Sequence, residues 1–182
     1  MKTDRLSLRP FTVDDAEAQR AAVLESLSAL LPWMPWAKDE PTSVEDRRKL
    51  LREWAVDWSS GSSFSYAIIR DDELAGGCGL MRRFGPAAFE IGYWVHVDHT
   101  GRGYATECAR ALTDVAFGDP SVARVVIQTD RANVASAAVA KKLGFAFIGE
   151  HERPPEAAGE SGIRQVWMMR RDLWLRLAGG AD

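Results

Sequence analysis

A glycine-rich segment between a strand-like and a helix-like stretch is suited to bind an anion. Residues 98–106 read Asp-His-Thr-Gly-Arg-Gly-Tyr-Ala-Thr, where Gly101 and Gly103 can take positive φ angles and small side chains let a ligand approach the backbone. Free N–H groups at the start of a helix bind phosphate oxygens. The segment lacks the Lys-Ser/Thr pair of a Walker A motif and the third glycine of a dinucleotide fingerprint. It predicts a different phosphate site or, as the alternative, a tight connection.

The strand-like segment before this turn carries a candidate general base. Across residues 88–97 the odd positions are apolar, whereas the even positions hold Glu90, Gly92, Trp94 and His96. One face should therefore pack in the core while the other is free for chemistry. Glu90 is the candidate base, acting through water, and a structural ion pair with a nearby arginine is the alternative.

Two histidines follow in the same stretch. His96 lies roughly 20 Å beyond Glu90 by strand rise, so it cannot serve the same atom. We place His96 and His99 near the glycine-rich turn. No third ligand accompanies them, so we predict no metal site.

The elements that hold these groups follow from the hydrophobic pattern and its turn residues. A short strand around Leu6 and Leu8 precedes a helical first quarter, and three antiparallel strands follow it. Strands and helices then alternate, which indicates an α/β (α+β) fold. The expected helices are 14–31, 43–60, 104–117 and 134–143, and the later strands are 64–70, 74–84, 88–97, 122–129, 145–153 and 164–170.

Composition limits the possible functions. The 182 residues are 46% apolar and carry a net charge of -3, which predicts a single domain over 1–182 and no nucleic-acid ligand. The two cysteines, Cys78 and Cys108, cannot make a disulfide framework or a C-x-x-C knuckle. No apolar run approaches the ~20 residues of a membrane span. We therefore expect a soluble cytoplasmic protein.

Five motifs in order give the chain a family resemblance. These segments are Thr3–Pro10, Trp33–Trp36, Glu90–Val95, Gly103–Glu107, and Asn133-x-x-Ser136 leading to Lys142–Phe145. With them the chain resembles the GNAT superfamily of N-acetyltransferases, and within it the RimJ/RimL-like branch, which acetylates ribosomal-protein N-termini and related amines. The resemblance implies a mixed, mostly antiparallel sheet of about seven strands flanked by helices, with a V-shaped split between the fourth and fifth strands.

The resemblance also implies how acetyl-CoA, the acyl donor, would bind. Pantetheine would lie along the strand carrying Val95 and Val97, and Asn133 would hydrogen-bond it, although Asn133 is also a favoured helix N-cap. Thr100 departs from the family pattern, which has Gln or Arg there. The diphosphate would bind the amides of Gly101, Arg102, Gly103, Tyr104, Ala105 and Thr106.

For the reaction, the resemblance implies direct attack by an amine in a ternary complex. Many members use a tyrosine acid two positions before Lys142, but Ala140 occupies that position, so Ser136 is the remaining donor for the thiolate. The acceptor wall would include Trp33 and Trp36, with Tyr66 and Arg82 as further candidates. Trp54 and Trp58, at helical spacing, are expected in the core instead.

The acceptor we expect is the N-terminal α-amine of a protein or peptide, and ribosomal proteins are among the candidates. Deprotonating a lysine amine at pH 7 costs about 4.6 kcal/mol, whereas an α-amine costs only about 1 to 1.4 kcal/mol, so a strong base matters less for the latter. The alternatives are a small amine (a polyamine, an antibiotic or an amino acid) and a non-catalytic acyl-CoA-binding protein. The acyl-chain preference stays open, and a homodimer is a further prediction.

Overall fold

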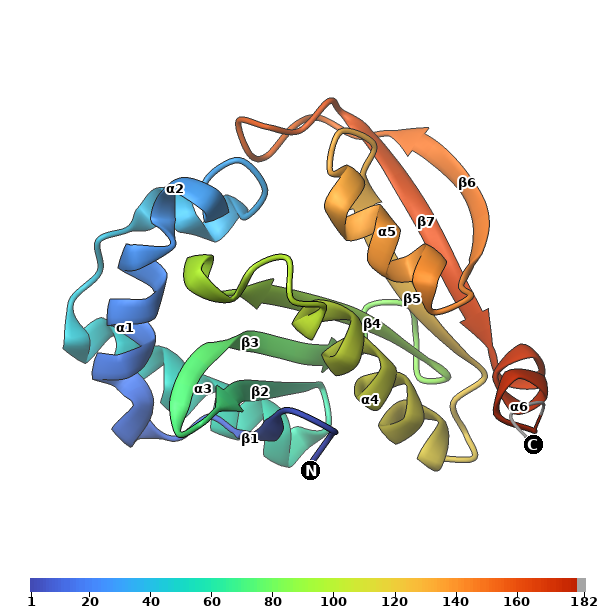
Figure 1. Cartoon of the computed structure of the whole chain (residues 1–182), viewed down its shortest axis with the longest axis horizontal. Coiled ribbons are helices and arrows are strands. Elements are labelled where there is room, and N and C mark those ends of the chain that lie inside the picture. The colour runs from blue at the N-terminus through green and yellow to red at the C-terminus, as the bar shows by residue number, and fades with distance from the viewer. Residues whose placement is uncertain (180–182) are drawn as a thin grey trace.

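Seven strands form one sheet with the order β1-β2-β3-β4-β5-β7-β6 (Figure 1). The structure is a computed structural model, which describes residues 1–179. Every neighbouring pair is antiparallel except β4 and β5, which are parallel. The strands are β1 Ser7–Pro10, β2 Ser63–Arg70, β3 Glu73–Met81, β4 Ala88–Val95, β5 Arg124–Asp130, β6 Ala146–Glu152 and β7 Ile163–Arg170.

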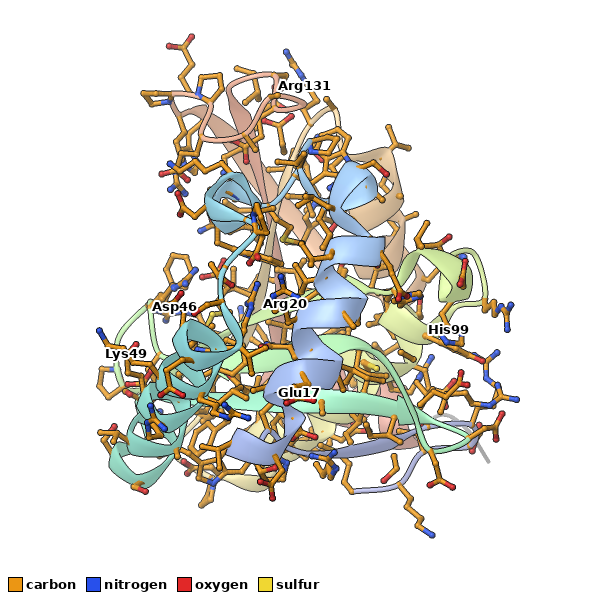
Figure 2. The ribbon with its side chains drawn as sticks, turned by 90° about the vertical axis from the view of Figure 1, so that its left-hand side faces the viewer. Glu17, Arg20, Asp46, Lys49, His99 and Arg131 are labelled. Atoms are coloured by element: carbon orange, nitrogen blue, oxygen red, sulfur yellow. The ribbon has the colours of Figure 1, made fainter. Side chains whose placement is uncertain are left out.

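Helices cover both faces of this sheet. α4 packs on β3 and β4 and α5 packs on β5, whereas α1 packs on β3 and α3 on β2. The two groups lie on opposite faces, and Figure 2 shows α1 crossing one of them. The α-helices are α1 Ala16–Glu25, α2 Leu27–Leu30, α3 Val44–Ser60, α4 Tyr104–Gly118, α5 Val134–Lys142 and α6 Arg171–Gly179, and the 3-10 helices are η1 Val13–Asp15, η2 Pro35–Asp39 and η3 Val97–His99.

Local sequence signals set several of these boundaries. Ser43 and Asp46 form a capping box at the start of α3, and Gly61 ends this helix in the left-handed conformation at φ 73°. The turn between β2 and β3 places Asp71 and Asp72 at positive φ, as a tight hairpin requires. The predicted antiparallel meander is therefore confirmed as β2, β3 and β4.

The central sheet splits between β4 and β5. These strands pair only from Ala88 to Glu90 on β4 and from Arg124 to Val126 on β5. Beyond these residues the two strands have no ladder, which opens a gap in the middle of the sheet (Figure 1). The expected fold class, including the split between the fourth and fifth strands, is confirmed.

The core lies between the sheet and α4. Phe89 and Ile91 of β4 pack with Cys108 and Leu112 of α4, all of them buried. A smaller cluster on the other face joins Phe11 to Leu51 of α3. Within residues 1–179 no helix has both the length and the apolar character needed to cross a bilayer.

One expected helix is wrong, and the structure adds two features for which no expectation was stated. The helix expected over 14–31 is interrupted at Ser26, whose hydroxyl accepts a hydrogen bond from the Val97 amide at 3.0 Å. The sequence analysis missed α6, which is held by Trp174 against Phe117 and Asp114. The connection 154–162 has no apolar anchor but is tied by polar contacts, because the Gly159 amide donates to the Pro32 carbonyl at 2.9 Å.

Candidate active site

A cavity of about 980 Å³ lies over the side of β3 and β4 that faces α1. Its floor is formed by facing residues of the two strands: Gly77 opposite Trp94, Gly79 opposite Gly92, and Met81 opposite Glu90. Because three of these six residues are glycines, the sheet there carries little side-chain volume. The cavity exists where side chains are missing from the strands.

Glu90 stands at one end of this floor. Its side chain is only 13% exposed, and its carboxylate lies 3.3 Å from the guanidinium of Arg83, which is 65% exposed. The ion pair of the alternative interpretation is present, and the structure also places Glu90 in the lining of the cavity. Arg83 was missed by the sequence analysis.

Tryptophans form the wall of the cavity. Trp33 and Trp36, which flank Met34 and Pro35, both line it. Trp54 packs on Phe11 with ring centroids 5.3 Å apart, and it also lines the cavity. The expected place in the core is therefore only part of its position. Trp58 packs against the core as expected.

Two proposed wall residues lie elsewhere. Tyr66 is buried in the core against Trp58, with ring centroids 4.9 Å apart, and borders neither cavity described here. Arg82 stacks over Phe89 at 4.2 Å from the ring centroid and donates to the Gly61 carbonyl. Arg82 therefore stabilises the fold and does not form part of the acceptor wall. Its neighbour Arg83 lines the cavity instead.

Two polar side chains line the same cavity from α1 and α3. Gln19 and Arg47 are both buried, and Arg47 is ion-paired with Glu40. Among the described residues, Gln19 Oε1 and Arg47 Nε have no hydrogen-bond partner. Burial lowers the pKa of Arg47, with a smaller effect from Arg20. Arg20 itself binds the Thr42 carbonyl (Figure 2).

A second cavity, of about 170 Å³, occupies the split between β4 and β5. Asn133 and Ser136 of the α5 start line it, together with Glu90 and Tyr93. Glu90 and Tyr93 also line the larger cavity, so the two cavities meet beside them. Asn133 caps α5, because its Oδ1 accepts from the Ser136 amide at 3.0 Å.

Tyr93 is the second residue that the sequence analysis missed. Its hydroxyl lies 2.9 Å from Ser136 Oγ and 3.2 Å from the Ser136 carbonyl oxygen. Burial raises the pKa of Tyr93 to about 12, against a smaller lowering by the bond to Ser136. Tyr93 lies at an apolar position of β4, so the alternating pattern assigned it to the core. Its hydroxyl was the one feature of the sequence that could have indicated a role in the site.

The glycine-rich turn presents free main-chain donors. Gly101 and Gly103 take φ angles of 73° and 82°, and Gly103 is the N-cap of α4. Within residues 1–179, none of the amides from Gly101 to Thr106 donates a hydrogen bond. The Thr100 hydroxyl is occupied by the Val97 carbonyl. These amides at the positive end of a 15-residue helix form an arrangement that fits a diphosphate.

Side chains from the N-terminal segment brace this turn. Arg5 donates to the Arg102 carbonyl and pairs with Glu107 of α4 at 2.7 Å. Burial pushes the pKa of Glu107 up, but hydrogen bonds from Thr3 and Arg5 outweigh burial and leave this pKa lowered. The Tyr104 side chain is buried and bonds Arg70, so only its amide faces the turn's open side.

The segment joining β4 to the turn holds the remaining candidates. Val95 ends the strand and Val97 begins η3, and both are half-buried. His96 is buried with its Nε2 2.9 Å from Glu25 of α1, and its ring lies 5.8 Å from His99. His99 stands beside the turn (Figure 2), 5.9 Å from the Tyr104 ring.

A family model described as the acetyltransferase (GNAT) domain matches residues 5–146. The chain belongs to the GNAT family. Among curated relatives, it is 31% identical to YnaD of Bacillus subtilis, an uncharacterized N-acetyltransferase, over 79% of this chain and 80% of that protein. This GNAT protein is accordingly an N-acetyltransferase.

Solved acetyltransferase structures share the fold of most of the chain. RimL, a ribosomal L7/L12 α-N-protein acetyltransferase solved with coenzyme A, superimposes with a TM-score of 0.86 at 24% identity and covers 94% of this chain and 97% of its own. The microcin C7 self-immunity acetyltransferase MccE, solved with acetyl-CoA and AMP, superimposes with a TM-score of 0.84 at 18% identity. The match covers 92% of this chain and 93% of MccE. These identities show a common fold.

Proposed function

We propose that this GNAT protein acetylates the α-amine at the end of a protein or peptide. The meeting of the two cavities at Glu90 carries the proposal. The larger cavity, of about 980 Å³, offers room for the first residues of a chain, and the smaller one is lined by Ser136 and Asn133. The shared fold with RimL, a ribosomal L7/L12 α-N-protein acetyltransferase, supports a ribosomal protein as the acceptor.

The donor would be bound by the turn and the split. The free amides of 101–106 would hold its diphosphate, Asn133 would bond its pantetheine arm, and Val95 and Val97 would contact that arm. When bound, acetyl-CoA supplies an acetyl thioester next to the cavity junction. The described residues offer no Cys or Ser-His pair placed as a covalent nucleophile, so the amine attacks directly.

Each protein group then has one task. Glu90 takes up, through water, the proton that the amine nitrogen loses as the C–N bond forms. The C–S bond breaks and its electron pair stays on sulfur, and Ser136 donates a hydrogen bond to that thiolate. Solvent supplies the final thiol proton. An α-amine needs only modest help to become neutral, which suits a carboxylate acting through water.

A matched pair of glycine variants tests donor binding. Gly103→Val forces a branched side chain into a positive φ at the turn, whereas Gly61→Val does so at φ 73° in the C-cap of α3. We expect Gly103→Val to weaken coenzyme A binding at least tenfold by calorimetry, while Gly61→Val binds normally. Equal affinity in both would contradict the proposed diphosphate site.

Acceptor choice is tested by thiol release from acetyl-CoA. Peptides with free N-termini should turn over faster than the same peptides with blocked N-termini and a free lysine. A small amine is the second candidate, favoured by the aromatic wall of a cavity whose volume suits a small molecule. Faster turnover of small aromatic amines than of any peptide would select it.

A further inference from the structure

The Tyr93 hydroxyl has no task in the reaction proposed above, although it lies at the junction of both cavities. It reaches across the split from β4 to Ser136, in the first turn of α5. No other described residue bonds the Ser136 hydroxyl. The Tyr93 hydroxyl thus contacts both the hydroxyl and, at 3.2 Å, the carbonyl oxygen of Ser136, beside the proposed site of the departing sulfur.

The two hydroxyls differ as hydrogen-bond donors. A phenol is the stronger acid of the two, so it is the better donor, and serine is the better acceptor. The phenol proton has two acceptors within reach, Ser136 Oγ at 2.9 Å and the Ser136 carbonyl oxygen at 3.2 Å. When it is directed at the nearer acceptor, Oγ, the serine keeps its own proton for another partner. Burial raises the pKa of Tyr93 to about 12, so the phenol stays protonated at every pH at which an enzyme of this kind works.

The serine backbone is also fixed. Its amide donates to Asn133 Oδ1 at 3.0 Å, so the Asn133 cap holds the first turn of α5 in place. Ser136 is thus held at two points, at its amide by Asn133 and at its hydroxyl by Tyr93. The remaining freedom of Ser136 is rotation of its hydroxyl group, and the hydrogen bond with the Tyr93 phenol restricts this rotation.

We propose that Tyr93 is a positioning residue that aims the Ser136 proton at the thiolate sulfur. This inference rests on the acetyl transfer proposed above. The proton stays on Ser136, because a serine hydroxyl is far too weak an acid to give it to a thiolate. The pair acts by stabilising negative charge on sulfur, and it thereby lowers the pKa of the bound coenzyme A thiol.

The test titrates the thiol of coenzyme A bound to the protein, following thiolate absorbance in the ultraviolet against pH. In the unaltered protein we expect a pKa below that of free coenzyme A. Tyr93→Phe and Ser136→Ala should each move it back toward the free value. Thr113→Val, which removes the buried hydroxyl bonded to Ala109 on α4, is the matched control and should leave it unchanged.

Kinetics give a second readout. Tyr93→Phe should lower kcat roughly tenfold, the effect of one hydrogen bond to a charged group, with little change in KM for acetyl-CoA. The double variant Tyr93→Phe/Ser136→Ala should be no slower than Ser136→Ala alone, because the phenol acts through the serine.

The outcomes separate the two proposals. An unchanged thiol pKa in Tyr93→Phe, with coenzyme A still bound, would overturn the role of Tyr93 and leave the acetyl transfer intact. Additive losses in the double variant would also overturn it. Failure of the unaltered protein to bind coenzyme A would overturn both. An unchanged thiol pKa in Ser136→Ala would overturn the role of Tyr93 as well, because the phenol is proposed to act through that serine, and this readout does not depend on the folding of Tyr93→Phe.

Discussion

The charge balance around Glu90 decides what this carboxylate can do. Arg83 holds it from one side only, at 3.3 Å, and most of the Arg83 side chain is in water. Water can solvate the guanidinium when it moves away, whereas the largely buried Glu90 carboxylate then needs another cationic partner. Glu90 can therefore exchange Arg83 for an incoming ammonium group at small cost.

Replacing Glu90 by glutamine should expose its catalytic role. We expect Glu90→Gln to lower kcat/KM by about 10²- to 10⁴-fold, the usual contribution of a general base, with coenzyme A affinity unchanged. Steady-state kinetics and calorimetry measure the two quantities. Glu150→Gln removes another arginine-paired carboxylate, on β6, and should behave like the unaltered protein. Equal activity of the Glu90 variant would leave this residue with a structural role alone.

At the scale of single residues, the sequence predicted which side-chain types line the site better than it predicted the face of the sheet on which each side chain lies. The period of two placed Glu90 on the open face of β4, and it does line the cavity. The same rule assigned Tyr93 to the core, because alternation does not reveal that a strand leaves its neighbour and uncovers that face. Arg82 and Arg83 follow the end of β3, where a shift of one residue exchanges the two faces.

Among the elements, the connection between β6 and β7 depends on a buried carboxylate. Asp130, at the end of β5, accepts hydrogen bonds from the Ser161 amide and hydroxyl and from the Ala132 amide, at 2.8 to 2.9 Å. Burial pushes the pKa of Asp130 up, but these bonds outweigh it and lower the pKa. One side chain thus ties β5, the start of α5 and the 154–162 connection together.

The sign of the pH effect follows from this lowered pKa. Asp130 stabilises the fold fully above the unfolded carboxyl pKa of ~3.9, and this contribution is lost as pH falls through the folded value. Asp130→Asn should cost about 1 to 3 kcal/mol of unfolding free energy at pH 7, and the difference from the unaltered protein should shrink in acid. Denaturant unfolding of both proteins, at pH 7 and at a pH below the unfolded carboxyl pKa, measures this difference in unfolding free energy. Asp98→Asn, at a side chain 81% exposed, should change little, and an equal loss there would contradict the argument.

Elements bounded by strong local signals could be predicted, and those fixed by distant contacts could not. The capping box of α3 and the meander are local, and the sequence located both. The break at Ser26 depends on the Val97 amide, and α6 depends on Phe117 and Asp114, all far away in sequence. The split itself was expected only through the family resemblance, since no residue pattern says where a ladder ends.

At the scale of the whole molecule, two distant parts of the chain meet over the split. The Gly159 amide bonds the Pro32 carbonyl, so the connection 154–162 reaches the segment after α2 (Figure 1). A Cβ at position 159 would lie 2.7 Å from both the Cβ and the carbonyl oxygen of Pro32. Glu160 and Arg164, next to this contact, line both cavities.

An alanine at position 159 should therefore push these two parts of the chain apart. We expect Gly159→Ala to raise KM for the acceptor several-fold while coenzyme A affinity stays within about twofold, since one displaced contact costs about 1 kcal/mol. Gly118→Ala, where a Cβ meets nothing within 4 Å, is the control. An unchanged acceptor KM in Gly159→Ala would mean that the contact does not shape the site.

The glycines beneath the larger cavity have a practical consequence for redesign. A Cβ at Gly79 would lie 2.9 Å from the rigid Phe64 carbonyl, but one at Gly92 would meet only the flexible tip of Met81, at 3.0 Å. Position 92 is thus a place where bulk can be added in steps without disturbing the scaffold. A graded series there would set the largest acceptor that the enzyme admits.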